Sequence, residues 1–241
     1  MVATPNQVPI PAIEYPSSDG EPVAETSVHL YALLTTLEVL RQYLDGQTAM
    51  VLANQFLYYS QGMPKLRVAP DVMVIFDVEP GPRDNYKIWE EGQVPSVIFE
   101  MTSKGTQDQD KSFKKMLYEQ LGVQEYWLFD PKGEWIGQQL EGYRLERGVY
   151  YPITDGQSEA LRLRLQVEGQ LIGFYREDTD EKLLIPGELA QAVKQEALAR
   201  QQAEQRAEAA EQRAEQERQR AEAAEARLAE LEAQLKEQKD R

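Results

Sequence analysis

Hydrophobic and polar positions follow two different periods along the first part of the chain. From residue 25 to residue 44, apolar side chains recur at intervals of three and four, which predicts a helix that Asp45-Gly46 brings to an end. Two further segments, Val72–Phe76 and Val97–Met101, have the length of strands and are apolar except at Glu100. Such runs are typical of strands that are buried on both faces.

A second helix is predicted between Thr106 and Leu121. Thr106 and Gln109 match a capping box, in which the threonine is the N-cap and the glutamine is the third helical residue. Gly122 marks the end of the helix, because glycine commonly follows the last turn. The apolar stripe of this helix consists of Phe113, Leu117 and Leu121.

Shorter apolar or alternating runs predict the remaining strands. Those after residue 133 alternate, which predicts antiparallel strands that extend or flank the sheet. The resulting mixture of helices and strands indicates a mixed α/β domain. The strands predicted in this way are Met50–Ala53, Phe56–Tyr59, Tyr126–Phe129, Tyr143–Leu145, Val149–Tyr151, Leu161–Leu165 and Leu171–Tyr175.

The sequence changes character after Pro186-Gly187, where Ala, Glu, Gln and Arg dominate. Ala and then Leu recur with heptad spacing, ending at Leu228, Leu231 and Leu235, so the tail is predicted to be a helix of about 50 residues and roughly 75 Å. Two interpretations remain open: a solitary solvated helix, or a coiled coil that forms a homo-oligomer or binds a partner protein. We therefore expect an extended arm over 1–16, an α/β domain over 17–187 and a helical coiled-coil tail over 188–241.

Composition excludes several classes of site. The chain has no cysteine and one histidine, which excludes disulfide scaffolds, thiol nucleophiles, Cys-ligated zinc and multi-histidine zinc sites. No apolar run approaches the roughly 18 residues of a membrane span, and the first 16 residues lack the features of a signal peptide. We therefore expect a soluble, cytoplasmic protein that does not bind membranes.

Net charge argues against non-specific binding of nucleic acid. The formal charge is −15, and the tail from Ala190 onward holds 10 basic and 12 acidic residues, so a charge of −13 remains for the body. Affinity for phosphate backbones comes largely from Lys and Arg. A nuclease with this composition needs a local cluster of basic residues or a bound metal to neutralise its site.

Two acidic residues stand at the ends of neighbouring predicted strands. Asp71 follows Pro70 at the head of one apolar run, and Glu100 closes the other. A buried carboxylate is costly unless it is paired or bound to metal, and two of them can hold a hard cation such as Mg²⁺ against a phosphate. The pair therefore points to a metal-dependent nuclease.

The expected lysine of such a site is not where the simplest motif puts it. In PD-(D/E)XK nucleases a lysine follows the second acid by two residues, but this chain has Thr102 there. Two other lysines are candidates: Lys104 in the loop after the strand, and Lys114 on the following helix. Asp110, Lys114 and Tyr118 are spaced by four residues and therefore share one flank of that helix.

A longer pattern of residues carries a resemblance to a known family. Its most specific part is Gly-Val-x-Glu-Tyr-Trp-x-x-Asp-Pro at residues 122–131. On these residues the chain resembles the Uma-type restriction endonuclease family, of the PD-(D/E)XK nuclease superfamily, over about residues 15–175. The rest of the pattern consists of Asp19-Gly20-Glu21, His29, Pro70-Asp71, Glu100-Met101-Thr102-Ser103, Thr106, Asp110, Lys114 and Tyr118.

The resemblance implies a restriction-endonuclease-like fold, in which helices flank a mixed central sheet. It implies that Asp71 and Glu100 are metal ligands for Mg²⁺ or Mn²⁺, and it favours Lys114 over Lys104 as the catalytic lysine. An acid near the first helix often completes such a site. Glu25 is preferred to Glu21 because it lies nearer the start of the helix.

Two functions from different classes remain. The first is a Mg²⁺-dependent endonuclease that hydrolyses phosphodiester bonds in DNA. The second is a catalytically inactive protein of nuclease fold that recruits partners or oligomerises through its C-terminal coiled coil. The acidic body and Thr102 favour the second function, whereas the Asp71–Glu100 pair favours the first.

Overall fold

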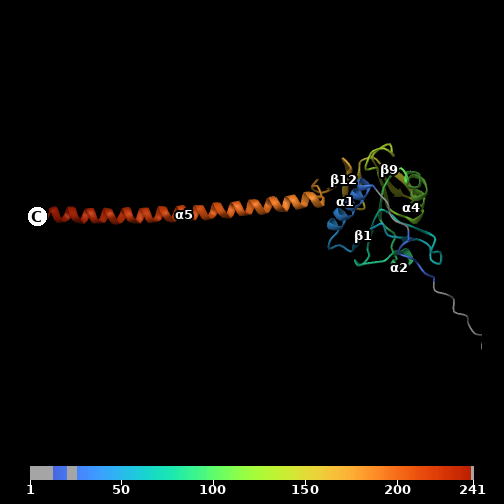
Figure 1. Cartoon of the computed structure of the whole chain (residues 1–241), viewed down its shortest axis with the longest axis horizontal. Helices are drawn as coiled ribbons and strands as arrows, with labels where there is room; N and C mark the ends of the chain where they lie inside the picture. The colour runs from blue at the N-terminus through green and yellow to red at the C-terminus, as the bar shows by residue number, and fades with distance from the viewer. Residues whose placement is uncertain (1–12, 21–25, 240–241) are drawn as a thin grey trace, which may run out of the picture. The chain divides into compact units, whose positions relative to one another are not determined.

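The computed structural model describes residues 13–20 and 26–239 of the chain, with side chains up to residue 229 (Figure 1). The chain divides into two compact units, Met1–Pro186 and Gly187–Arg241. Within the described residues, no helix combines the length and apolar character needed to cross a membrane.

A six-stranded mixed sheet forms the centre of the first unit. Its strands lie in the order β1-β4-β6-β7-β8-β9. The β6–β7 pair is parallel and every other neighbouring pair is antiparallel. The strands are β1 (Ala49–Ala53), β4 (Val72–Phe76), β6 (Val97–Met101), β7 (Glu125–Phe129), β8 (Leu140–Glu146) and β9 (Val149–Ile153).

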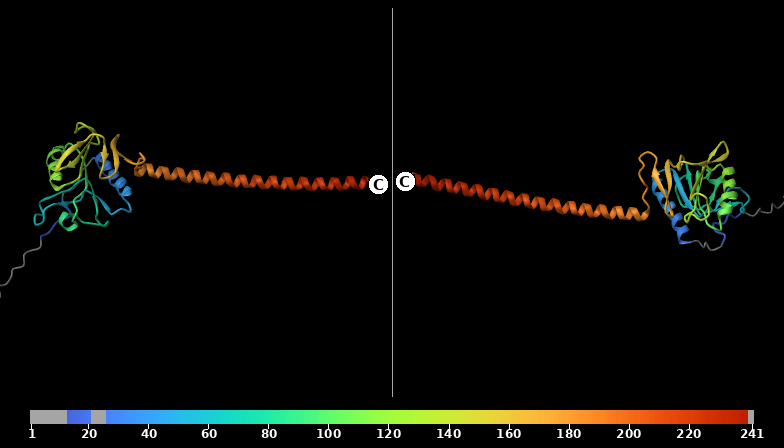
Figure 2. Two further views of the ribbon diagram at one scale, coloured as in Figure 1. Left: turned by 180° about the vertical axis from the view of Figure 1, so that it is seen from behind. Right: turned by 90° about the horizontal axis from the view of Figure 1, so that it is seen from above.

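Both faces of this sheet are covered, as the apolar strands require. Helix α1 (Ser27–Tyr43) packs on one face, and α4 (Lys115–Leu121) packs on the other; Figure 2 shows the sheet between them. Alternate residues of β4 divide between the two cores: Val72 and Val74 face α1, whereas Met73 and Ile75 face α4. The helix expected over residues 25–44 and the two buried strands are thereby confirmed.

Two small sheets complete the first unit. One contains β10 (Gln157–Ser158), β11 (Leu163–Glu168) and β12 (Leu171–Arg176), and its apolar side chains join the core beneath α1. The other contains β2 (Leu57–Tyr58), β3 (Arg67–Val68) and β5 (Tyr86–Lys87), which leads into the short helix α2 (Ile88–Glu91). The strand predicted at Leu161–Leu165 begins two residues later, because Arg162 adopts a left-handed conformation with a φ of 57°.

The second predicted helix forms, but not as a uniform α-helix. It consists of α3 (Gln107–Gln109), a π-helical turn η1 (Asp110–Lys114) and α4, and it ends at Gly122, which has a left-handed φ of 84°. The predicted capping box is wrong, because the Thr106 hydroxyl accepts the backbone N–H of Ser103 and makes no cap hydrogen bond. The predicted stripe is also wrong at Phe113, which is 48% exposed.

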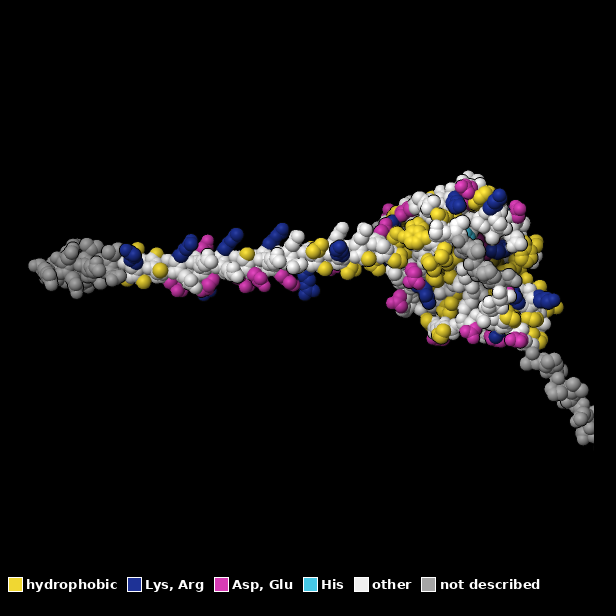
Figure 3. Space-filling model, viewed as in Figure 1, with side chains coloured by type: hydrophobic (Ala, Val, Ile, Leu, Met, Phe, Trp, Pro, Cys, Tyr) yellow, Lys and Arg dark blue, Asp and Glu magenta, His cyan; other side chains and the backbone are white. Residues whose placement is uncertain are grey.

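The second unit consists of one helix, α5 (Pro186–Lys239), so the long helix expected in the tail is confirmed. Every side chain from residue 189 to residue 229 is exposed. Basic and acidic side chains are interspersed along this stretch (Figure 3), and two of them, Arg200 and Glu204, form an ion pair of 3.2 Å one turn apart. Such pairs stabilise a solvated helix by a few tenths of a kcal/mol each.

Candidate active site

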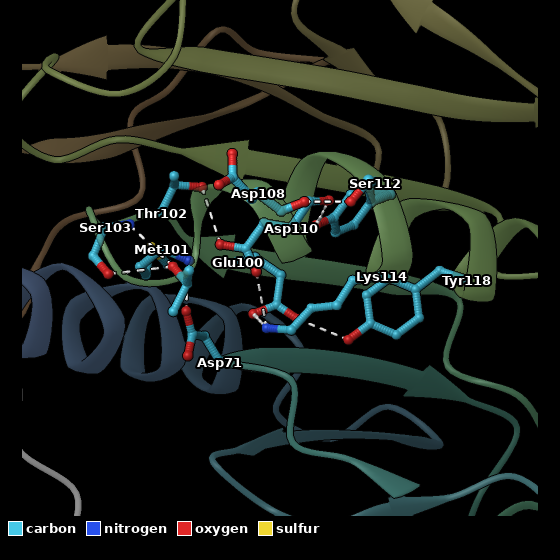
Figure 4. Close-up of polar contacts among 12 residues, drawn as sticks. Asp71, Glu100, Met101, Thr102, Ser103, Asp108, Asp110, Ser112, Lys114 and Tyr118 are labelled. Atoms are coloured by element: carbon cyan, nitrogen blue, oxygen red, sulfur yellow. Dashed lines mark hydrogen bonds and ion pairs between the residues drawn. The ribbon is translucent and has the colours of Figure 1, made fainter. Parts of the chain in front are cut away.

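The two acidic residues singled out in the sequence lie at neighbouring strand ends of the central sheet. β4 and β6 are antiparallel, with Val72 opposite Phe99. Asp71 immediately precedes β4, so the same register carries it opposite Glu100. Glu100 faces the helix that contains α4, whereas the Asp71 carboxyl at the strand end also reaches α1. Figure 4 shows both carboxyl groups together with Lys114 and Tyr118.

Asp71 is held by backbone and by the histidine of the first helix. Its Oδ2 atom accepts the backbone N–H of Met101 at 2.6 Å. The same oxygen lies 3.7 Å from Nε2 of His29, and the side chain of Asp71 is 14% exposed. The carboxylate therefore stands at the edge of the buried region with a fixed orientation.

Glu100 is enclosed by donors from the helix that covers it. Lys114 Nζ donates to Oε2 at 2.8 Å, and the Tyr118 hydroxyl donates to Oε1 at 2.7 Å. The side chain of Glu100 is 1% exposed, so these contacts take the place of water. Each carboxylate oxygen has two lone pairs, and each therefore retains acceptor capacity toward a further ligand.

The π-helical turn brings a third carboxylate to the same ammonium group. Asp110 begins the turn, and its Oδ1 atom lies 3.0 Å from Lys114 Nζ. The Thr102 hydroxyl lies 3.5 Å from Asp110 Oδ2, and the Tyr126 hydroxyl donates to the Asp110 carbonyl at 2.9 Å. π-turns inside α-helices are often found at functional sites. Here the turn directs both ends of an i, i+4 pair toward Glu100.

Burial dominates the ionisation of this cluster. It raises the pKa of the Glu100 carboxyl from 4.5 to about 8; Lys114 opposes the shift, while Asp71 and Asp110 add to it. Burial would lower the pKa of the Lys114 ammonium, but Glu100 and Asp110 together outweigh burial and raise that pKa. The pKa of the Tyr118 hydroxyl is also raised, by burial first and then by Glu100. Lys114 is therefore a permanent cation beside a carboxyl that resists ionisation.

The residues fit a divalent cation. Hard cations such as Mg²⁺ prefer carboxylate oxygens, and Mg²⁺ commonly takes only one or two of them from the protein. Asp71 and Glu100 supply such oxygens from adjacent strands. Over the residues that the structure describes, there is no group of three or more Asp, Glu, His or Cys residues that would hold a metal.

Of the predicted site residues, the structure brings together Asp71, Glu100 and Lys114. Lys104 is exposed and instead lines a neighbouring pocket. Glu21 and Glu25 lie outside the described residues. Lys114 is not the exposed member of a surface ion pair, because its side chain is 15% exposed and contacts two buried carboxylates.

Sequence reasoning missed the contact between His29 and Asp71. The sequence places His29 early in the first predicted helix, and nothing in its spacing indicates which strand it contacts. One signal could have indicated the contact with Asp71. His29 is the only histidine of the chain, and it lies early in a predicted helix.

Comparison with known proteins identifies the family of this chain and finds related solved structures. Residues 4–175 match the Uma2 family, whose description is "Putative restriction endonuclease". A crystal structure of a putative nuclease belonging to DUF820, from Anabaena variabilis, is 18% identical and covers 59% of this chain and 77% of its own. Its TM-score against this chain is 0.41. No curated protein matches the chain.

Proposed function

Because this chain belongs to the Uma2 family of restriction endonucleases, we propose that it is an endonuclease that hydrolyses phosphodiester bonds in DNA with Mg²⁺ or Mn²⁺. One observation carries the proposal: the Asp71 carboxyl accepts the backbone N–H of Met101, the residue after Glu100, and an ammonium group lies 2.8 Å from Glu100 itself. Two acids can hold a divalent ion that activates water and polarises a phosphate, and a fixed cation beside them can stabilise the charge that develops in the transition state.

Asp71 and Glu100 are the proposed metal ligands. A bound Mg²⁺ or Mn²⁺ would polarise a phosphoryl oxygen and lower the pKa of a bound water. The Met101 N–H donates to Asp71 and the Tyr118 hydroxyl donates to Glu100, and these two bonds would hold the carboxyl groups in place when an ion binds. In this proposal Tyr118 is a positioning residue, since it acts through Glu100.

Lys114 is the proposed catalytic lysine. Its raised pKa makes it a poor proton acceptor, so we assign it to orienting the attacking water and to stabilising negative charge that develops on the scissile phosphate. Glu25 is proposed to assist the metal or the water from the segment that precedes α1.

A plasmid-cleavage assay tests the proposal. Asp71→Ala and Glu100→Ala should each abolish Mg²⁺-dependent cleavage while circular dichroism shows an intact fold. Asp84→Ala, which removes an exposed carboxylate in the loop before β5, is the matched control and should cut like the wild type. Equal cleavage by the wild type and an Asp71→Ala/Glu100→Ala variant would show that the site assignment is wrong.

The tail is proposed to mediate association, either between copies of the chain or with a partner protein. Supporting this role, α5 is 54 residues long and has exposed apolar side chains at Leu189, Val193, Leu198 and Leu228. Light scattering of the full chain and of residues 1–186 tests it. An unchanged oligomeric state on truncation would contradict self-association.

A further inference from the structure

A second polar feature lies directly beside the Asp71–Glu100 pair. It is a pocket of about 240 Å³ between the start of α1, the loop after β6 and the loop after β7. The volume is smaller than the roughly 300–1,000 Å³ of sites for drug-sized ligands, so the pocket suits one small unit of a larger molecule. We call it the β7-loop pocket; its functional groups are His29, Thr102, Lys104, Lys132 and Trp135.

The β7-loop pocket and the candidate active site share a wall. His29 lines the pocket and lies 3.7 Å from Asp71 Oδ2. Thr102 also lines it, and its hydroxyl lies 3.5 Å from Asp110 Oδ2. A ligand in the pocket is therefore one side chain away from the proposed metal ligands on one side and from the Lys114 cluster on the other.

The charge of the pocket is opposite to that of the body. Lys104 and Lys132 both line it, and none of the described lining residues is acidic. Acidic residues outnumber basic ones in the chain by 41 to 26, so two lysines on the wall of one small pocket stand out from the composition of the chain. Such a local cluster selects an anionic ligand. Trp135 adds a partly exposed aromatic ring to the same wall.

One buried carboxylate holds the backbone of the loop that carries Lys132 and Trp135. Asp130 is fully buried and accepts the backbone N–H groups of Lys132, Gly133, Trp135 and Ile136. The Lys111 ammonium donates to the Trp135 carbonyl at 2.6 Å from the opposite side. Because these bonds fix the loop backbone, the pocket is preorganised and does not need a ligand to form it.

We propose that the β7-loop pocket binds the nucleotide next to the scissile phosphate. Lys104 and Lys132 contact its phosphate, and the Trp135 ring stacks on its base. Lysines bind phosphates as point charges, and stacking on an aromatic ring tolerates any base. The proposal rests on the proposed function because it names the same substrate, but it concerns binding and does not need metal or cleavage.

Binding of DNA by the full chain in EDTA tests the inference, because cleavage is then suppressed. The probe is a fluorescein-labelled DNA duplex with a single-stranded overhang, followed by fluorescence anisotropy over a range of salt concentrations. Lys104→Ala/Lys132→Ala should weaken binding and lower the slope of log affinity against log salt by about 1 for each lysine. Lys65→Ala, an exposed lysine between β2 and β3, is the matched control and should leave both unchanged.

Trp135 is tested separately in the same assay. Trp135→Ala should weaken binding roughly 5- to 150-fold, the range for loss of one stacked base, whereas Trp135→Phe should stay close to the wild type. Equal affinity and salt slope for the double lysine variant, Trp135→Ala and Lys65→Ala would overturn the inference, as would failure of the wild-type chain to bind the probe.

The two proposals fail in different ways. Cleavage that requires Asp71 but is indifferent to Lys104, Lys132 and Trp135 would refute the pocket and leave the endonuclease standing. Binding that requires these three residues, with no metal-dependent cleavage, would support the pocket and refute the endonuclease.

Discussion

Replacing Glu100 by glutamine should remove a pH dependence of stability that the structure assigns to this residue. Burial raises the pKa of its carboxyl from 4.5 to about 8 in the folded chain. Between these two values the folded state keeps a proton that the unfolded state releases. The unfolded state therefore binds fewer protons, and the free energy of unfolding falls as pH rises.

The size of the effect follows from the shift. Each unit of pKa is worth about 1.4 kcal/mol, so this single group should lower the free energy of unfolding by about 4 kcal/mol between pH 4.5 and pH 8. Because Glu100 is 1% exposed, solvent does not screen this term appreciably. In Glu100→Gln the amide does not titrate. The loss of a carboxylate acceptor for Lys114 and Tyr118 shifts the whole curve by an amount that does not depend on the Glu100 proton.

Urea unfolding of both proteins in EDTA, at intervals from pH 4.5 to pH 8, measures the difference curve. We expect the free energy of unfolding of the wild type to fall steadily relative to that of Glu100→Gln as the pH rises across this range. Parallel curves would show that Glu100 has the same pKa in the folded and the unfolded chain. If the free energy of unfolding of the wild type instead rises with pH relative to that of Glu100→Gln, the ion pair with Lys114 outweighs burial and the pKa of Glu100 is lowered.

Three further substitutions test individual contacts, each by urea unfolding at fixed pH. Tyr118→Phe removes the 2.7 Å hydrogen bond to Glu100 and, at a pH where Glu100 keeps its proton, should cost about 0.5–1.5 kcal/mol. A cost near zero would mean that the contact does not orient the carboxyl. In the wild type the two carboxylate oxygens of Asp130 accept four backbone N–H groups, whereas the side chain of Asp130→Asn has only one acceptor oxygen. The substitution should therefore cost about 1–3 kcal/mol for each N–H group left without a partner and make the following loop more sensitive to proteases. An unchanged rate of proteolysis would contradict this role of Asp130. Gly142→Ala would place a Cβ 2.5 Å from the Trp127 ring and should cost about 1–3 kcal/mol, and an unchanged midpoint would show that the ring moves freely.

The buried strands could be predicted from the sequence with their observed bounds. Val72–Phe76 and Val97–Met101 are uninterrupted enough that only burial on both faces accommodates them. The side-chain positions of the helix that follows Val97–Met101 could not be predicted in the same way, because no sequence pattern indicates the π-helical turn at Asp110–Lys114. In that turn Asp110 and Lys114 take the inward positions beside Glu100, which leaves Phe113 on the outside.

The meeting of Asp71, Glu100 and Lys114 could also be expected, since strand ends and helical spacing constrain all three. The contact of His29 with Asp71 could not, because it depends on how α1 lies across the sheet. The position of the loop that Asp130 holds could not be predicted either, because it too depends on how distant parts of the chain pack together. Asp-Pro marks a turn in the sequence, but only the fold shows that this turn borders the candidate active site.

Crystals grown with Mn²⁺ would show whether Asp71 and Glu100 bind a metal, because anomalous scattering locates the ion without reference to activity. We expect one Mn²⁺ peak between the carboxyl groups of Asp71 and Glu100, and the loss of that peak in Asp71→Asn. A wild-type crystal with no peak at this pair, or with Mn²⁺ bound only elsewhere, would contradict the claim that these two acids form a metal site.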